Sequence, residues 1–319
     1  MQFNATDTYP VTVDIVRQLV PSRSFPTQSN RFINSLDFDD SGKFLLSAGD
    51  DDQLMLYNIM TGDFFRAITS KKYGCSCARY LHSDQHVVHA STKRDDTIRL
   101  LSLYDQKYIR YFQGHKETVT GLSVSPIDDM FITSSKDRTI RFWDAKQEVC
   151  AGVMNLPEAG AVAFDPEGLV IAVAIGSEQI RLYDKRSYEN GPFISFDLGV
   201  IKDTQWTNIK FSEDGKSILI MTSGNYHRLI DAFNGGITHS LTGHTNHSGA
   251  VLDACFSPDS QFIFCGGTDG RITVWSREDG TIVHQFNSDQ RDPVLHCLYN
   301  PFYHIMASAG LSTKLWTLQ

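Results

Sequence analysis

Short runs of alternating apolar and polar residues, separated by turn sequences, make up most of the chain. In the segment RTIRFWD (138–144), Ile140 and Phe142 fall on one side of an extended chain. Arg141 and Trp143 fall on the other side, as the two-residue period of a β-strand requires. Turn sequences rich in Asp, Pro and Gly follow several such runs. They include DDSGK (39–43), DPEG (165–168), SEDGK (212–216) and SPDSQ (257–261). The pattern predicts a chain of β-hairpins.

A larger unit of this kind recurs seven times. Each copy holds a strand, a turn, a second strand, a tight turn with Asp or Gly, and a third strand. The copies end near Tyr57, Leu101, Trp143, Tyr183, Ile230, Trp275 and Trp316, at spacings of 40 to 47 residues. This period, with four strands per unit, is typical of a β-propeller of WD repeats. We therefore predict an all-β protein, a seven-bladed WD-repeat propeller over residues 22–319.

The stretch GHKETVTGLSVSPIDDMFITSSKDRTIRFWD (114–144) contains residue types that a hydrolase would use, namely His, Ser, Thr and Asp. It also resembles a repeat of the WD-repeat family, with the GH and WD dipeptides of that family, and the resemblance runs from about Ser22 to Trp316. This resemblance implies a hydrogen-bonded tetrad that holds a blade together, because buried polar groups must satisfy one another. The implied members are His115, Thr133 or Ser135, Asp137 and Trp143.

Other repeats depart from this pattern. The sixth keeps His244, Asp269 and Trp275, but Cys265 stands where a hydroxyl is expected, so we expect a weaker tetrad there. Three further blades lack a member of the set and must depend on packing. The departures are Ser177 in the fourth, Ile230 in the fifth and Gly310 in the seventh.

The two ends of the chain are expected to meet. An open propeller would expose strand edges, which invite aggregation. The last repeat ends at Gln319 without a fourth strand, so SRSFP (22–26) is placed to supply it. Residues 1–21 are interpreted as an N-terminal extension, disordered over residues 1–10. Its segment VTVDIVRQLV (11–20) fits either a short helix or a strand.

Charge and composition exclude several functions. The net charge of −8 and the lack of long basic runs argue against direct nucleic-acid binding and favour a basic peptide as partner. The start MQFNATDTYP does not resemble a signal peptide, and no run approaches 18 apolar residues, so neither secretion nor membrane insertion is expected. The six cysteines lack a zinc-like CxxC pair and are interpreted as reduced, buried thiols.

Catalytic and metal motifs are not evident. The sequence contains no GxSxG, HExxH, P-loop or Rossmann pattern. His82, His86 and His89 have the spacing of metal ligands on a helix, but the repeat places them across a hairpin, with His86 and His89 on opposite faces of one strand. We therefore predict no catalytic residue, metal or cofactor. An interaction scaffold is favoured over an enzyme or metal protein that uses these histidines.

A partner is expected on one face of the propeller. There the loops between blades and the turns with the tetrad Asp converge around the central channel, so one peptide would meet several blades. The candidate binding residues are Arg31, Phe32, Asp50, Tyr73, Arg94, Lys136, Asp203, Trp206, Tyr226 and Asp292.

Several individual segments resemble a narrower group, the nuclear Swd-two or WD-repeat protein eighty-two family. They are SKKYG (70–74), residues 95–115, 125–144 and 164–193, RLIDAFNG (228–235) and PDSQFI (258–263). The resemblance implies a nuclear, non-enzymatic adaptor in two assemblies. One is COMPASS, which methylates lysine four of histone three and whose catalytic subunit would be bound through its N-terminal region. The other is the mRNA cleavage and polyadenylation machinery with its phosphatase module, which acts in transcription termination. The alternative is an adaptor of another nuclear or cytosolic complex.

Overall fold

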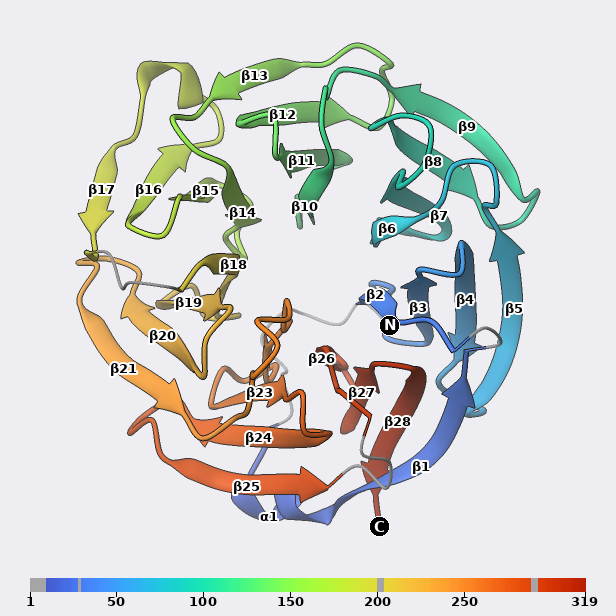
Figure 1. Ribbon diagram of the computed structural model, residues 1–319, viewed down its shortest axis with the longest axis vertical. Helices are drawn as coiled ribbons and strands as arrows, with labels where there is room; N and C mark the ends of the chain where they lie inside the picture. The colour runs from blue at the N-terminus through green and yellow to red at the C-terminus, as the bar shows by residue number, and fades with distance from the viewer. Residues whose placement is uncertain (1–9, 28–29, 200–203, 288–291) are drawn as a thin grey trace.

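Seven four-stranded antiparallel sheets stand around a central axis in the computed structural model, which describes residues 10–27, 30–199, 204–287 and 292–319 (Figure 1). The predicted fold, a seven-bladed β-propeller, is confirmed. In the first six blades the strands follow in sequence order from the axis outward. Each residue near which a repeat was predicted to end lies in the third strand of its blade.

The strands alternate direction within each blade, as short hairpin connections require. Blade one contains β2 (Ile33–Phe38), β3 (Phe44–Gly49), β4 (Gln53–Asn58) and β5 (Asp63–Thr69). Blade two contains β6 (Ser76–Leu81), β7 (Ser83–Ala90), β8 (Ile98–Ser102) and β9 (Lys107–Phe112). Blade three contains β10 (Val119–Val124), β11 (Met130–Ser135), β12 (Thr139–Asp144) and β13 (Gly152–Asn155). Blade four contains β14 (Gly160–Phe164), β15 (Val170–Ile175), β16 (Gln179–Asp184) and β17 (Ile194–Asp197). Blade five contains β18 (Trp206–Phe211), β19 (Ser217–Thr222), β20 (Tyr226–Asp231) and β21 (Ile237–Thr242). Blade six contains β22 (Cys255–Phe256), β23 (Phe262–Gly266), β24 (Arg271–Ser276) and β25 (Ile282–Asn287). Blade seven contains β26 (His296–Tyr299), β27 (Ile305–Ala309), β28 (Ser312–Leu318) and β1 (Leu19–Pro26).

The core is divided among the interfaces between neighbouring blades. In β12, Ile140 and Phe142 pack in one cluster with Ile171 of the fourth blade. Trp143, which points to the other side of the same strand, packs with Phe112 of the second blade. Both faces of the sheet are therefore buried, which is why the middle strands are apolar at successive positions rather than on one side only.

The ring closes through the N-terminal strand. β1 pairs antiparallel with β28, from Leu19 opposite Leu318 to Pro26 opposite Ser312, with a bulge between Pro21 and Arg23. The predicted closure is confirmed, and the strand begins at Leu19, ahead of the predicted boundary at Ser22.

The segment before β1 is a short helix, α1 (Val13–Gln18). Thr12 caps it, since its side-chain oxygen accepts a hydrogen bond from the Ile15 amide at 3.3 Å. The segment 11–20 thus contains both a short helix and the beginning of a strand, so each predicted alternative holds for part of it. Residues 1–9 lie outside the described part of the chain. A second helical element is the 3-10 turn η1 (Tyr188–Asn190). In the described residues no helix has the length and apolar character to cross a membrane.

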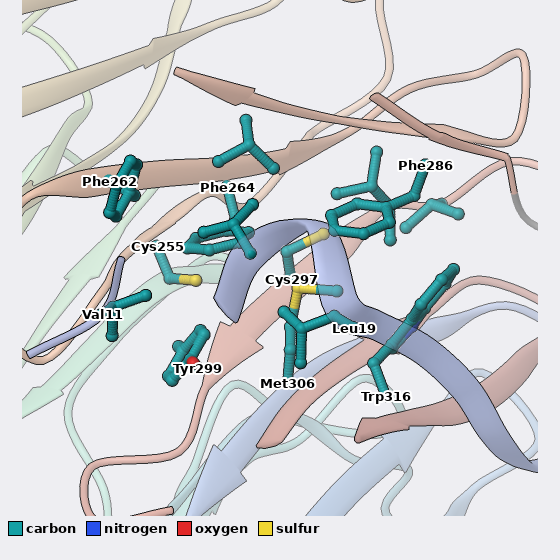
Figure 2. Close-up of a cluster of buried hydrophobic side chains, with 14 residues drawn as sticks. Val11, Leu19, Cys255, Phe262, Phe264, Phe286, Cys297, Tyr299, Met306 and Trp316 are labelled. Carbon is teal, nitrogen blue, oxygen red and sulfur yellow. The ribbon is translucent and has the colours of Figure 1, made fainter. Parts of the chain in front are cut away.

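Val11, Val16 and Leu19 anchor this helix and strand to the propeller. They belong to a buried cluster between the sixth and seventh blades, part of which is drawn in Figure 2. The cluster includes Phe264 of β23 and Trp316 of β28. Residues 10–21 are therefore packed against the propeller rather than appended to it.

Candidate interaction face and channel of the propeller

The third blade contains a continuous chain of polar side chains. His115 Nδ1 lies 2.9 Å from Asp137 Oδ2, and His115 Nε2 lies 2.8 Å from Thr133 Oγ1. The Trp143 indole Nε1 donates to the same hydroxyl oxygen at 2.9 Å. The hydroxyl of this chain is thus Thr133, while Ser135 donates instead to the Glu117 carbonyl.

This arrangement leaves no nucleophile for hydrolysis. Asp137 accepts a hydrogen bond from the Nδ1–H of His115, so Nε2 of the neutral ring accepts a hydrogen bond from the Thr133 hydroxyl. Burial lowers the pKa of His115, although the Asp137 carboxylate opposes that shift, and the neutral ring is favoured. Thr133 is fully buried and also bonded to Trp143, so no substrate can reach its oxygen.

The sixth blade does not form the set predicted for it. His244 makes no hydrogen bond to Asp269, and neither ring nitrogen of His244 has a hydrogen-bond partner among the described residues. The Trp275 indole donates to the Thr242 carbonyl at 2.8 Å. Asp269 accepts from the Arg271 amide at 3.1 Å within its own turn. The prediction of a weakened tetrad was wrong here, because the chain is broken on both sides of His244.

Cys265 is the physical reason for this break. Its sulfur lies 3.1 Å from Nε2 of the buried His227, which belongs to the fifth blade. The His227 ring stacks on the His244 ring, with centroids 4.2 Å apart and planes at 18°. Without a hydroxyl at position 265, the two imidazoles pack against each other, and the Trp275 indole donates to a backbone carbonyl instead.

The two blades give a matched test of the tetrad. Asp137→Ala removes an acceptor for His115, for the Lys116 amide and for both donors of Thr139, so we expect a loss of about 2 to 3 kcal/mol in the free energy of unfolding. Asp269→Ala should cost less than about 1 kcal/mol, because it removes only turn contacts. Urea unfolding of both variants measures the difference, and equal losses would contradict the structural role given to Asp137.

The second blade uses a different polar contact. Leu101 stands where the third blade has Trp143, and Arg99 of the same strand is almost fully buried. Its guanidinium lies 3.6 Å from the centre of the Tyr73 ring and pairs with both oxygens of Asp95, at 2.9 and 2.8 Å. The sequence analysis missed this stack, because DDTIR (95–99) repeats the spacing of DRTIR (137–141), where Asp137 bonds to His115 instead.

Antiparallel strands place all connections of one kind at the same end of the molecule. We call the end that carries Phe32, Tyr73 and Lys136 the loop face. The opposite end, with the turns 39–43, 165–168 and 212–216, is the turn face. The candidate binding residues lie in loops or at strand ends on the loop face, except Asp203, which is outside the described residues. Exposed members are Arg31, Phe32, Asp50, Arg94 and Lys136.

The other candidates are partly buried for structural reasons. Tyr73 lies under the Arg99 guanidinium. Trp206 packs on the cluster between the fourth and fifth blades, and its amide donates to Ser177 Oγ at 3.1 Å. Tyr226 and Asp292 are half-buried. Among the candidate aromatic side chains, Phe32 is therefore the most exposed, at 38 %.

A charged network that the sequence did not indicate crosses the inner ends of the fifth to seventh blades. Asp253 is 6 % exposed, and its carboxylate lies 2.8 Å from the Lys210 ammonium. Asn208 Nδ2 donates to it at 3.1 Å, and His296 Nδ1 lies 3.8 Å away. Burial alone would raise the pKa of Asp253, but Lys210 and His296 hold it well below its usual range. Repeat patterns do not reveal this pairing because its members occupy different positions in their blades.

The three histidines with the spacing of metal ligands have separate roles. His82 bridges blades, since its ring nitrogens lie 2.8 Å from Asp40 Oδ2 and 2.8 Å from the Ser125 carbonyl oxygen. His86 and His89 lie three residues apart on β7 and so point to opposite sides. Burial lowers the pKa of His89 to about 4. In the described ranges no group of three His, Cys, Asp or Glu side chains could hold a metal ion. The six cysteines are free thiols.

Sequence comparison gives the relatives of the chain. The family described as "WD domain, G-beta repeat" matches residues 19–58, 106–144 and 235–276. The WD repeat-containing protein 82 of Drosophila melanogaster is 43% identical over 302 residues, which are 95% of this chain and 95% of that protein. The chain belongs to the WD repeat-containing protein 82 family. The alignment with the Drosophila melanogaster protein thus spans nearly the whole propeller.

Two fungal relatives carry names that refer to an assembly. The Set1 complex component swd2 of Schizosaccharomyces pombe is 37% identical over 81% of this chain and 74% of that protein. The COMPASS component SWD2 of Saccharomyces cerevisiae is 34% identical over 77% of each chain. The chain is thus a WD-repeat scaffold homologous to a COMPASS component.

Proposed function

We propose that this protein is a non-catalytic adaptor subunit of a COMPASS-type histone methyltransferase assembly in the nucleus. The observation that carries the proposal is its identity of 34 to 37% to relatives named as Set1 complex and COMPASS components, over most of the chain. The adaptor binds the N-terminal region of the catalytic subunit, which methylates lysine four of histone three. Its contact with chromatin and RNA polymerase is indirect.

The physical chemistry of the molecule supports an adaptor. Its catalytic-looking residues are hydrogen-bonded to one another in a buried chain. The net charge of −8 suits a basic polypeptide partner and opposes direct binding to nucleic acid. The exposed part of the loop face combines one aromatic ring, Phe32, with charged side chains of both signs, a composition found in protein interfaces.

We propose in addition that the adaptor serves the mRNA cleavage and polyadenylation machinery with its phosphatase module. A closed ring in which every blade packs on two neighbours has little freedom to switch shape. Partner choice then comes from competition for the loop face, and the two assemblies bind overlapping parts of it.

Recovery of partners from nuclear extract tests these proposals. The tagged protein should recover the methyltransferase catalytic subunit and cleavage and polyadenylation subunits, identified by mass spectrometry. Phe32→Ala should reduce recovery of both by about tenfold, because an aromatic side chain near the centre of an interface contributes about 2 kcal/mol or more. Phe233→Ala, which alters an exposed ring in the turn after β20, is the matched control and should leave recovery unchanged.

The outcomes separate the parts of the proposal. Absence of every methyltransferase subunit would contradict the adaptor assignment. Loss of one assembly and retention of the other in the Phe32 variant would contradict the shared use of the loop face. Recovery of both assemblies in a single ternary complex would do the same.

A further inference from the structure

A recess of about 320 Å³ lies at the turn-face end of the channel. Inner strands of the first five blades and the turns that follow them form its wall. Polar and apolar side chains both contribute to this wall, and most of the apolar ones are largely buried between the blades. The apolar ones include Phe38, Leu122, Val162, Phe164 and Phe211. A recess of this volume has room for one long side chain of a partner.

Charged groups from three blades line the same recess. The acids are Asp37, Asp40 and Glu213, and the basic groups are Arg79, Lys210 and His82. Two of the basic groups are already paired, because Lys210 lies 2.8 Å from Asp253 and His82 lies 2.8 Å from Asp40. Among the residues that the structure describes, the charged groups of the recess that remain without an ion-pair partner are two carboxylates, Asp37 and Glu213, and one guanidinium, Arg79. The recess therefore carries a net negative charge.

The two remaining carboxylates keep free acceptor capacity. Asp37 accepts a hydrogen bond from the Tyr80 amide at 2.7 Å. Arg79 Nη1 donates to the carbonyl oxygens of Leu36 and Ala78, at 3.2 and 2.8 Å. Within the described ranges the Glu213 side chain makes no hydrogen bond or ion pair, and it stays exposed at the mouth.

Burial disfavours the ionised forms of these two carboxylates and shifts their pKa values. Burial raises the pKa of Asp37 to about 6, although Arg79 opposes the shift, and burial also raises the pKa of Glu213. Glu213 reaches solvent, yet it lies within a concave wall of protein atoms that displaces much of its water. Both ionised forms would gain from a cation that entered the recess.

We propose that this recess is a second docking site, which accepts a basic side chain, arginine or lysine, of a partner polypeptide. The aliphatic stem lies along the apolar part of the wall, and the cationic head lies between Asp37 and Glu213. The added positive charge offsets the net negative charge of the recess. Because the recess opens on the turn face, a partner held there leaves the loop face free.

N-acetyl-arginine amide, a monocation with a capped backbone, is the probe. Binding to the full-length protein is measured at pH 7.5 by saturation-transfer NMR titration. N-acetyl-citrulline amide has nearly the same shape without the charge, and it should bind at least about tenfold more weakly. Asp37→Asn and Glu213→Gln should each weaken binding of the arginine probe by about tenfold. Glu167→Gln, which alters an exposed acid in a turn of the same face outside the recess, should leave it unchanged.

Three results would overturn the proposal. They are equal binding of the citrulline probe, unchanged binding in both recess variants, and binding of inorganic phosphate to the recess in place of the arginine probe. Self-association of the protein that the arginine probe does not reverse would assign the recess to a second copy, which also contradicts the proposal.

The thermal stability of Asp37→Asn separates lost binding from lost folding. A carboxyl with a raised folded-state pKa adds stability that is fully present below its unfolded pKa, and that stability is lost as the pH rises through about 6. At pH 7.5 the parent therefore holds an unfavourable charge, and the asparagine variant should melt at an equal or higher temperature. A variant that is more stable and binds less identifies Asp37 as a binding residue. A variant that melts lower and binds normally identifies it as structural.

Discussion

Deleting residues 1–27 is expected to convert the protein into an aggregating species. The deletion removes β1 and leaves β28 with an unpaired edge along the whole of its length from Ser312 to Leu318. It also removes Val11, Val16 and Leu19 from the cluster that contains Trp316. Exposed strand edges and apolar patches are both templates for association, so the loss concerns solubility as well as stability.

Size-exclusion chromatography with light scattering measures this result. The matched control lacks only residues 1–9 and retains both the helix and β1, so it should elute as the parent does. A monomeric 1–27 deletion with the melting temperature of the parent would show that the seventh blade does not need its outer strand.

Removing the Asp253 carboxylate, which lies at the centre of the charged network of the fifth to seventh blades, should cause the second large loss of stability. Asp253→Ala leaves the Lys210 ammonium without its buried partner and His296 without its nearest acid. Loss of one member of a mostly buried ion pair costs about 3 to 5 kcal/mol, because the remaining ammonium keeps only the Ala254 carbonyl as a hydrogen-bond partner among the described residues. At about 2 °C per kcal/mol for a large domain, the melting temperature should fall by about 6 to 10 °C.

Two comparisons make the Asp253 experiment specific. Asp63→Ala removes the same charge from an exposed position on β5 and should change the melting temperature by less than about 1 °C. The pKa of Asp253 is held well below its usual range, so its stabilising effect is present above about pH 4 and is lost as the pH falls. The difference between the parent and Asp253→Asn should therefore narrow in acid. A constant difference from pH 7 to pH 3 would show that charge is not the cause.

The sequence determined the blades because each depends on contacts close in the chain. The two-residue alternation around Trp143 and the Asp and Gly turns set strand and hairpin independently of the rest of the fold. The unit recurs seven times at spacings of 40 to 47 residues, which predicted seven blades. The absence of a fourth strand after Trp316 predicted closure by the N-terminus, since every other blade supplied its own outer strand.

Contacts between blades were decided only by the tertiary structure. The repeat pattern gave His244, Asp269 and Trp275 the same roles as their counterparts in the third blade, but the stacking of His244 on His227 broke that set. Asp253 and Lys210 lie in neighbouring blades, and no spacing along the chain predicts their pairing.

The recess on the turn face likewise depends on the tertiary structure. Asp37 and Glu213 come from blades one and five, and they line one wall only because the ring brings their inner strands to a common channel. Local sequence fixes the conformation of each hairpin because its hydrogen bonds join near neighbours. The side chains that meet across the channel depend on the curvature and closure of the whole ring, which no single repeat encodes.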